Sequence, residues 1–280
     1  MINFLHNFDP QPLLFSFGFL KVYWYGVFIV LGMSVGLLVV LFLAKRYKID
    51  RDYILDLCFY LLIFGFLGAR IYDVFLEWSY YSNHLVDIFK VWQGGLAIHG
   101  GILAGILVIY FFVRRRPVLG LSTRDGFLFI SSLLVVGLAI GQTIGRWGNY
   151  FNQELFGRPS NSPWSIFINP ANRPMEYMNN SWFHPTFLYE SLGCFIIFIV
   201  LFCLHWYFFK KKSYNTPRYL LIVSLYLILY SILRFFLEFV RIDFAPIVLG
   251  WRWPQIMSLL LILVTIGFNF WFYKKVKNNL

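Results

Sequence analysis

A small set of charged and polar side chains interrupts otherwise apolar stretches of this sequence. Arg146 and Asn149 are three residues apart, and Glu154 follows them. On a continuing helix, Arg146 and Asn149 would share a face and direct donors toward the membrane edge, where lipid phosphates lie. A guanidinium group can bind a phosphate through two parallel hydrogen bonds. The alternative is a structural Arg146 that reaches toward water and pairs with Glu154.

A second set lies further along the chain at helical spacing. Tyr230, Arg234, Glu238 and Arg241 are separated by four, four and three residues, which predicts one polar stripe on a helix. Such a stripe must face the protein interior or a wet cavity. Glu238 would hold either Arg234 or Arg241 and leave the other guanidinium for an anion. A purely structural ladder of ion pairs is the competing interpretation.

His99 is the candidate proton acceptor. It is flanked by the pairs Gly94-Gly95 and Gly100-Gly101, which we expect to clear space for a bulky ligand. Imidazole titrates near neutral pH and can take a proton from a nucleophile. A buried histidine with a purely structural role is the alternative. Tyr25, within Trp24-Tyr25-Gly26, belongs either to an interfacial belt of aromatic residues or to a pocket wall.

Two other polar positions have local explanations. Arg70 and Asp73 are three residues apart and are interpreted as a local ion pair. His184 precedes Pro185, and proline is favoured in the first turn of a helix, so His184 is interpreted as a residue at the helix start.

The composition predicts that these residues are positioned by membrane-spanning helices. The 280-residue chain is 59% hydrophobic and 13% charged, against about 45–50% apolar and about 25% charged residues in an average soluble domain. This excludes a soluble enzyme, a disordered tail and a disulfide scaffold. An all-α, polytopic membrane protein is predicted, because the apolar blocks approach the ~20 residues that cross a bilayer. The predicted spans are about 22–44, 53–72, 95–113, 126–146, 184–209, 219–240 and 254–273.

The basic residues predict the orientation. Clusters at 45–51, 114–124, 210–218 and 274–277 fall on the same side of the predicted spans, and this side receives most of the 24 Lys and Arg. The positive-inside rule then places the N-terminus outside and the C-terminus in the cytoplasm. The net charge of +11 is therefore interpreted as anchoring to anionic lipid, and nucleic acid is not expected as a partner.

We expect residues 1–280 to form a single transmembrane domain, with 147–183 as a small extracytoplasmic cap. This stretch is rich in Asn, Pro and Ser, which favour turns. Gly137, Gly141 and Gly145 recur every four residues, and Gly32 and Gly36 form a GxxxG pair. Both patterns predict closely packed helices.

Five motifs together carry a resemblance that covers nearly the whole chain. They are Trp24-Tyr25-Gly26, GGLAIHGG at 94–101, GRWGNYFNQELFG at 145–157, HPTFLYE at 184–190 and RFFLEFVR at 234–241. These motifs occur in the same order as in the bacterial phosphatidylglycerol–prolipoprotein diacylglyceryl transferases, which the sequence resembles. The motif at 145–157 is the most specific, and Tyr150 stands where the family usually has Phe, which keeps an aromatic ring.

The resemblance implies transfer of a diacylglyceryl group from phosphatidylglycerol to the lipobox cysteine thiol of a preprolipoprotein signal peptide. The products would be a thioether and glycerol 1-phosphate, and the site would be the bacterial cytoplasmic (inner) membrane. No cofactor and no metal are implied. Arg146 matches the family's lipid-binding arginine. The other matched positions of importance are Tyr25, His99, Asn149, Glu154, Tyr230, Arg234 and Glu238.

Two other classes of membrane protein compete with this interpretation. A retinal protein would need a lysine in the last span, and 256–273 contains none. A lipid or anion transporter, or a flippase, could use the same arginine-lined cavity, and the sequence leaves this alternative open.

Overall fold

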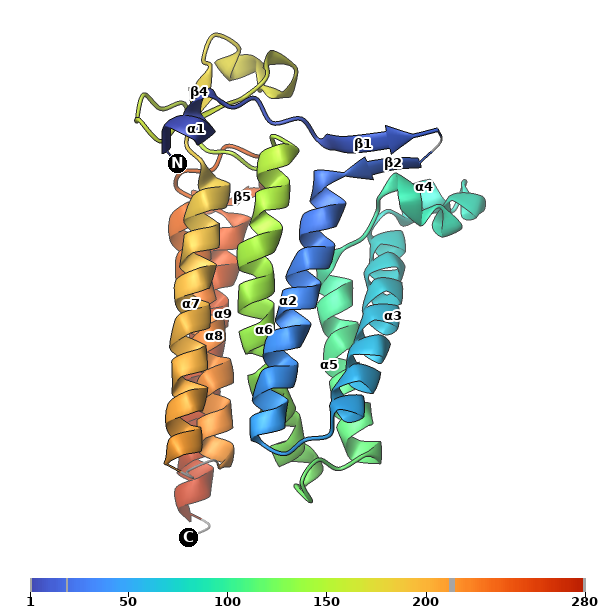
Figure 1. Ribbon diagram of the computed structural model, residues 1–280, viewed down its shortest axis with the longest axis vertical. Helices are drawn as coiled ribbons and strands as arrows, with labels where there is room; N and C mark the ends of the chain where they lie inside the picture. Colours follow the sequence, from blue (N-terminus) through green and yellow to red (C-terminus); the bar gives the residue numbers. More distant parts are fainter. Residues whose placement is uncertain (1, 19, 212–214, 279–280) are drawn as a thin grey trace. The chain divides into compact units, whose positions relative to one another are not determined.

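The fold is all-α, as the composition predicts. The computed structural model describes residues 2–18, 20–211 and 215–278 (Figure 1). Within these residues, seven helices are long and apolar enough to cross a membrane. They are α2 (Trp24–Arg46), α3 (Arg51–Leu76), α5 (Ile98–Arg115), α6 (Thr123–Phe151), α7 (Thr186–Lys210), α8 (Thr216–Leu237) and α9 (Trp253–Asn278). All seven predicted spans are confirmed. Lys212, in the third predicted basic cluster, lies outside the described residues.

The chain divides into two compact units, which are described separately. Unit 1 comprises Met1–Val39 and Leu134–Leu280, and unit 2 comprises Val40–Leu133. The first part of α2 and the last part of α6 therefore belong to unit 1 together with α7, α8 and α9. The single transmembrane domain stays a prediction.

Glycine contacts bring α2 and α6 together in unit 1. A Cβ added at Gly32 would lie 2.8 Å from the carbonyl oxygen of Gly141, and one at Gly36 would lie 2.7 Å from that of Gly137. Backbones can approach this closely only where no side chain intervenes. The interpretation of both glycine patterns as packing surfaces is confirmed.

Helices α7, α8 and α9 are joined by apolar contacts and a few polar ones. Gly193 of α7 packs against the side chain of Leu233 in α8. The Asn269 amide of α9 donates to the Ser224 hydroxyl of α8 at 2.7 Å. The Ser191 hydroxyl of α7 donates to the backbone carbonyl of Thr143 in α6 at 2.7 Å. These contacts hold α6, α7, α8 and α9 side by side (Figure 1).

A folded cap covers one end of these helices. Helix α6 continues to Phe151, so its last turn falls within the predicted cap at 147–183, and the bounds of the cap stay a prediction. The cap contains β3 (Ile166–Phe167) paired with β4 (Trp182–Phe183), and two short 3₁₀ turns, η3 (Pro170–Asn172) and η4 (Met175–Tyr177). The buried apolar side chains of its core are Leu5, Tyr150, Phe156, Ile166, Ile168, Phe183 and Phe187.

Leu5 shows that the N-terminal segment is part of this cap, which the sequence did not predict. It lies in the short helix α1 (Ile2–Asn7). Two further hairpins belong to unit 1. One consists of β1 (Leu13–Phe17) and β2 (Leu20–Tyr23), and the other of β5 (Ile247–Val248) and β6 (Trp251–Arg252).

Unit 2 is built on the pair α3 and α5. A Cβ added at Gly68 would lie 2.7 Å from the carbonyl oxygen of Gly100, and one at Gly101 would lie 3.3 Å from that of Gly65. The connection between α3 and α5 contains α4 (Trp78–Tyr81), η1 (Leu85–Phe89) and η2 (Val91–Gln93). The buried Arg70 fastens this connection through its guanidinium, which donates to the carbonyls of Asp87, Ile88, Gly94 and Gly95.

The predicted local pair of Arg70 and Asp73 is confirmed at 3.6 Å. The expectation that glycine clears space for a ligand around His99 is wrong for Gly100 and Gly101, because both face α3. A Cβ at Gly95 would meet the side chains of Arg70 and Asp73, so this glycine also serves packing.

Candidate active site

Glu190 lies at the centre of a charged cluster in unit 1. Its side chain is 3% exposed, and its Oε1 lies 2.8 Å from Nη2 of Arg146. Its Oε2 lies 3.6 Å from Nη1 of Arg234 and 4.0 Å from Nη1 of Arg241. The Tyr230 hydroxyl donates to Oε1 at 3.1 Å. One carboxylate therefore links cationic groups from α6, α8 and the segment that follows α8.

Glu238 is the second centre of this cluster and is 2% exposed. Its Oε1 accepts from Nη2 of Arg234 at 2.5 Å and lies 3.8 Å from Nε of Arg241. Its Oε2 lies 2.9 Å from Nε of Arg252. Arg241 also donates to Asp243 at 2.7 Å.

These contacts correct the expectation that Glu238 holds one arginine and frees the other. Arg234 and Arg241 both contact Glu190 and Glu238. The stripe also departs from a single helix, because α8 ends at Leu237 and Glu238 is its cap residue. The backbone N–H of Arg241 still bonds to the Leu237 carbonyl at 3.1 Å, so one more turn keeps Arg241 on the same side.

Asn149 connects Arg146 to the motif that follows it. Nη1 of Arg146 lies 3.4 Å from Oδ1 of Asn149, and Nδ2 of Asn149 donates to Glu154 at 2.7 Å. Because the amide nitrogen is used by Glu154, the amide oxygen is turned toward Arg146. The predicted common face of Arg146 and Asn149 is confirmed. The alternative pair of Arg146 with Glu154 is wrong within the described residues, since the carboxylate that Arg146 contacts is Glu190.

The Trp24-Tyr25-Gly26 motif contributes to both packing and a groove. The Trp24 ring stacks on Phe151 with 4.7 Å between centroids. Tyr25 packs against Gly148, where an added Cβ would lie 2.8 Å from the tyrosine ring. Tyr25 and Gly26 also line a groove of about 970 Å³. Tyr25 therefore lines a groove, and both its place in an interfacial belt and its role in the site stay predictions.

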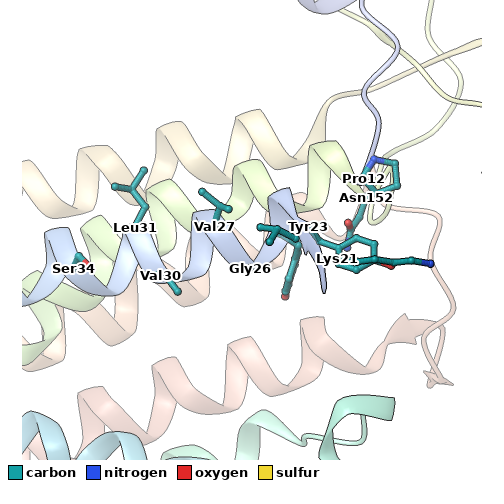
Figure 2. Close-up of a pocket in the computed structure, with 11 residues that line it drawn as sticks. Pro12, Lys21, Tyr23, Gly26, Val27, Val30, Leu31, Ser34 and Asn152 are labelled. Carbon is teal, nitrogen blue, oxygen red and sulfur yellow. The ribbon is translucent and has the colours of Figure 1, made fainter. Parts of the chain in front are cut away.

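This groove runs along β2 and the first half of α2 (Figure 2). Lys21, Tyr23 and Asn152 lie at one end, and Leu31 and Ser34 lie toward the other. Most of its wall is apolar, and the groove is open rather than enclosed.

His99 lies in the first turn of α5 in unit 2, whereas the arginine cluster belongs to unit 1. The ring is exposed and lies 6.1 Å from the Tyr72 ring, centroid to centroid. Exposure contradicts the alternative of a buried structural histidine. Its role as a base stays a prediction.

His184 is fixed at the start of α7, as its position before Pro185 predicted. Its Nδ1 lies 3.0 Å from the Tyr189 hydroxyl, which accepts from the Trp164 indole at 2.8 Å. Since the indole can only donate, the tyrosine proton is available to His184, whose Nδ1 then accepts. Partial burial lowers the pKa of His184 below its usual 6.5.

Within the described residues, no group of three or more His, Cys, Asp or Glu side chains could hold a metal ion. The cluster around Glu190 and Glu238 is instead completed by arginine. The guanidinium group of arginine binds anions such as carboxylate and phosphate through its planar donors.

The family model "Prolipoprotein diacylglyceryl transferase" matches residues 12–271. The chain belongs to this family.

Individual members of the family match most of the chain. The phosphatidylglycerol–prolipoprotein diacylglyceryl transferase of Parasynechococcus marenigrum is 38% identical over 281 residues, covering 97% of both chains. That of Prochlorococcus marinus subsp. pastoris is 40% identical, covering 86% of this chain and 82% of its own. That of Synechocystis sp. is 37% identical, covering 96% and 92%.

Sequence reasoning missed three charged members of the cluster, namely Glu190, Asp243 and Arg252. Glu190 carried a usable signal. It is a carboxylate within a predicted apolar span, and a charge at the centre of a span costs at least about 2.5–3.5 kcal/mol, so it requires a partner or a function. Arg252 lies in β6, and Asp243 lies shortly before β5. The sequence did not predict this hairpin.

Proposed function

We propose that the chain transfers the diacylglyceryl group of phosphatidylglycerol to the thiol of the lipobox cysteine of a prolipoprotein. The observation that carries this proposal is the bridge from Arg146 through Glu190 to Arg234 inside an apolar bundle. Membership of the diacylglyceryl transferase family and the names of the relatives support the same function.

Arg146 and Arg234 are the proposed clamp for the lipid phosphate. Their side chains are 24% and 19% exposed, whereas Glu190 between them is 3% exposed. The cluster contains four arginines, Arg146, Arg234, Arg241 and Arg252, against Glu190, Glu238 and Asp243, so it carries excess positive charge. A phosphodiester is singly charged and matches the planar donors of guanidinium groups.

The other proposed residues position this clamp. Glu238 fixes Arg234, while Tyr230 donates to Glu190 and lies 3.4 Å from Nη2 of Arg146. Asn149 and Tyr230 would orient the lipid phosphate, and Glu154 would orient Asn149. The groove beside Tyr25 has the apolar wall that acyl chains need.

The proposed reaction is a displacement at carbon. The cysteine thiol loses its proton, and the thiolate attacks the glycerol carbon that carries the phosphate oxygen. A carbon–sulfur bond forms while the carbon–oxygen bond breaks, and the electron pair leaves with glycerol 1-phosphate. The arginines would stabilise the charge that develops on the departing phosphate.

His99 is the proposed base for the thiol. A free cysteine has a pKa of about 8.5, so little of it is thiolate at neutral pH without help. The alternative is a thiolate stabilised by the arginine cluster alone.

We further propose that the protein lies in the bacterial cytoplasmic membrane with its N-terminus outside. The basic residues that follow α2, α5 and α7 support this orientation through the positive-inside rule. The cap and the arginine cluster would then face the outer side, where the mature part of an exported lipoprotein emerges.

The test is product formation by purified protein in detergent, with labelled phosphatidylglycerol and a lipobox peptide. We expect a thioether-linked diacylglyceryl peptide together with glycerol 1-phosphate. A transporter or flippase would form neither, because it moves its substrate without breaking a covalent bond. A peptide in which serine replaces the cysteine is the matched negative control. Absence of thioether product with the cysteine peptide would refute the proposal.

A further inference from the structure

A second, smaller pocket is lined by Glu238 and by Arg252, which contacts the Glu238 oxygen that Arg234 does not. Its volume is about 260 Å³, just below the about 300–1,000 Å³ of pockets for drug-sized ligands. Its lining residues are Arg158, Glu238, Phe239, Gly250, Trp251, Arg252 and Gln255. All of them belong to unit 1, and the proposed clamp uses only Glu238.

Gln255 gives this pocket a buried donor without an acceptor. Gln255 is 4% exposed, and its Oε1 accepts from the backbone N–H of Arg252 at 3.1 Å. A backbone N–H can only donate, so this contact fixes which end of the amide is oxygen. The remaining Nε2 is buried and has no hydrogen-bond partner among the described residues. An unmade hydrogen bond of this kind is costly, and Gln255 is one of the residues that line the pocket.

Charge around the pocket favours an anion. Arg158 and Arg252 line it with one carboxylate, Glu238, whose two oxygens already contact Arg234 and Arg252. Arg158 is an exposed residue and forms no ion pair within the described residues. Its backbone is held in place, since its N–H donates to Val240 and its carbonyl accepts from His184.

The backbone adds to this preference. Gln255 lies in the first turn of α9, which begins at Trp253. The N-terminus of a helix of this length carries partial positive charge from its unpaired N–H groups. Arg158 and the first turn of α9, which contains Gln255, therefore line the same small pocket.

We infer that this pocket binds a glycerol phosphate group. The phosphate oxygens would accept from Arg158 and Gln255, and the glycerol hydroxyls would lie against the polar edge formed by Glu238. The inference rests on the proposed function for the identity of the ligand. The group would belong either to released glycerol 1-phosphate or to the headgroup of an intact lipid.

The test measures binding without turnover, in purified full-length protein. Radiolabelled glycerol 1-phosphate and labelled phosphatidylglycerol in detergent micelles are titrated separately. The variants are Arg158→Gln and Gln255→Glu, and the second keeps the acceptor for the Arg252 N–H while it replaces the donor by an oxygen. Arg115→Gln is the matched control, because Arg115 is an exposed arginine at the end of α5 in unit 2.

We expect the dissociation constant of one probe to rise about tenfold or more in both pocket variants, as loss of a hydrogen bond to a charged group predicts. A rise for glycerol 1-phosphate identifies the released product as the ligand, and a rise for phosphatidylglycerol identifies the lipid. If Gln255→Glu does not fold, the exposed Arg158→Gln decides alone. Unchanged binding of both probes, or an equal loss in Arg115→Gln, would overturn the inference.

Failure of this inference is distinguishable from failure of the proposed function. If thioether forms and probe binding is unchanged in the pocket variants, only the inferred glycerol phosphate site is refuted, and the proposed function stands. Weakened binding without any thioether product would leave an anion site in a protein of different activity.

Discussion

Oε1 of Glu190 lies 2.8 Å from Nη2 of Arg146, and the same carboxylate reaches Arg234 through its other oxygen. Glu190 thereby fixes the separation of the two guanidinium groups that we propose as the phosphate clamp. A carboxylate and a phosphodiester each carry one negative charge, and the planar guanidinium group recognises both. Glu190 therefore organises the clamp before lipid arrives. This preorganisation is the basis of the first prediction.

Glu190→Gln is expected to lower both stability and transfer. Removing one partner of a fully buried ion pair costs about 3–5 kcal/mol, and we expect less here because the Arg146 side chain keeps 24% exposure. The melting temperature in detergent should fall by several degrees and the transfer rate by at least about tenfold. Glu190→Asp keeps the charge and should recover part of the stability. Glu176→Gln, at an exposed cap position, is the control, and an equal loss there would contradict the prediction.

Arg146→Lys and Arg146→Ala separate charge from geometry. Lysine retains the positive charge but cannot contact Glu190 and Asn149 together, so we expect weaker phosphatidylglycerol binding. Alanine removes the charge as well and should abolish measurable binding. Titration of labelled lipid into purified protein checks both variants. Unchanged lipid affinity in Arg146→Ala would refute the clamp.

His99→Gln tests the proposed base. Glutamine retains hydrogen bonding but cannot accept the thiol proton, so turnover should fall by about 10²–10⁴-fold, the range typical of general acid–base catalysis. Lipid binding should be retained, which distinguishes loss of the base from unfolding. Raising the pH toward the thiol pKa of about 8.5 should restore part of the rate. Wild-type turnover in His99→Gln would refute His99 as the base and would favour a thiolate that is stabilised by the arginine cluster alone.

Stability should depend on pH through His184, which precedes α7. Burial lowers its pKa below the usual 6.5, so the folded state binds the proton less readily than the unfolded state. The stabilising contribution is therefore complete above about pH 6.5 and is lost as pH falls through 6.5 toward the folded pKa. Melting temperatures between about pH 7.5 and 5 should show this loss, and His184→Asn should make the profile flatter over that window. An identical profile in the variant would assign the pH dependence to other groups.

The spans and the polar stripes were predictable because each depends on residues close in sequence. Apolar length determines a spanning helix, and a spacing of three or four places Arg146 beside Asn149. Glu190 was not predictable as a partner of Arg146, because that pair depends on how α6 and α7 pack. The contact of Leu5 with the cap core likewise joins segments that lie far apart in the chain.

The glycine contacts of α2 and α6 lead to the last prediction. In Gly36→Ala the new methyl group would lie 2.7 Å from the Gly137 carbonyl oxygen, and a backbone atom cannot move aside as a flexible side chain can. The two helices must separate, so we expect a loss of about 1–3 kcal/mol in stability. Gly267→Ala is the matched control, because nothing lies within 4 Å of a Cβ there. Melting temperatures in detergent should fall for Gly36→Ala and stay unchanged or rise for Gly267→Ala, since alanine favours the helix. Equal melting temperatures for the two variants would mean that α2 and α6 tolerate separation, and that close glycine packing does not hold this pair together.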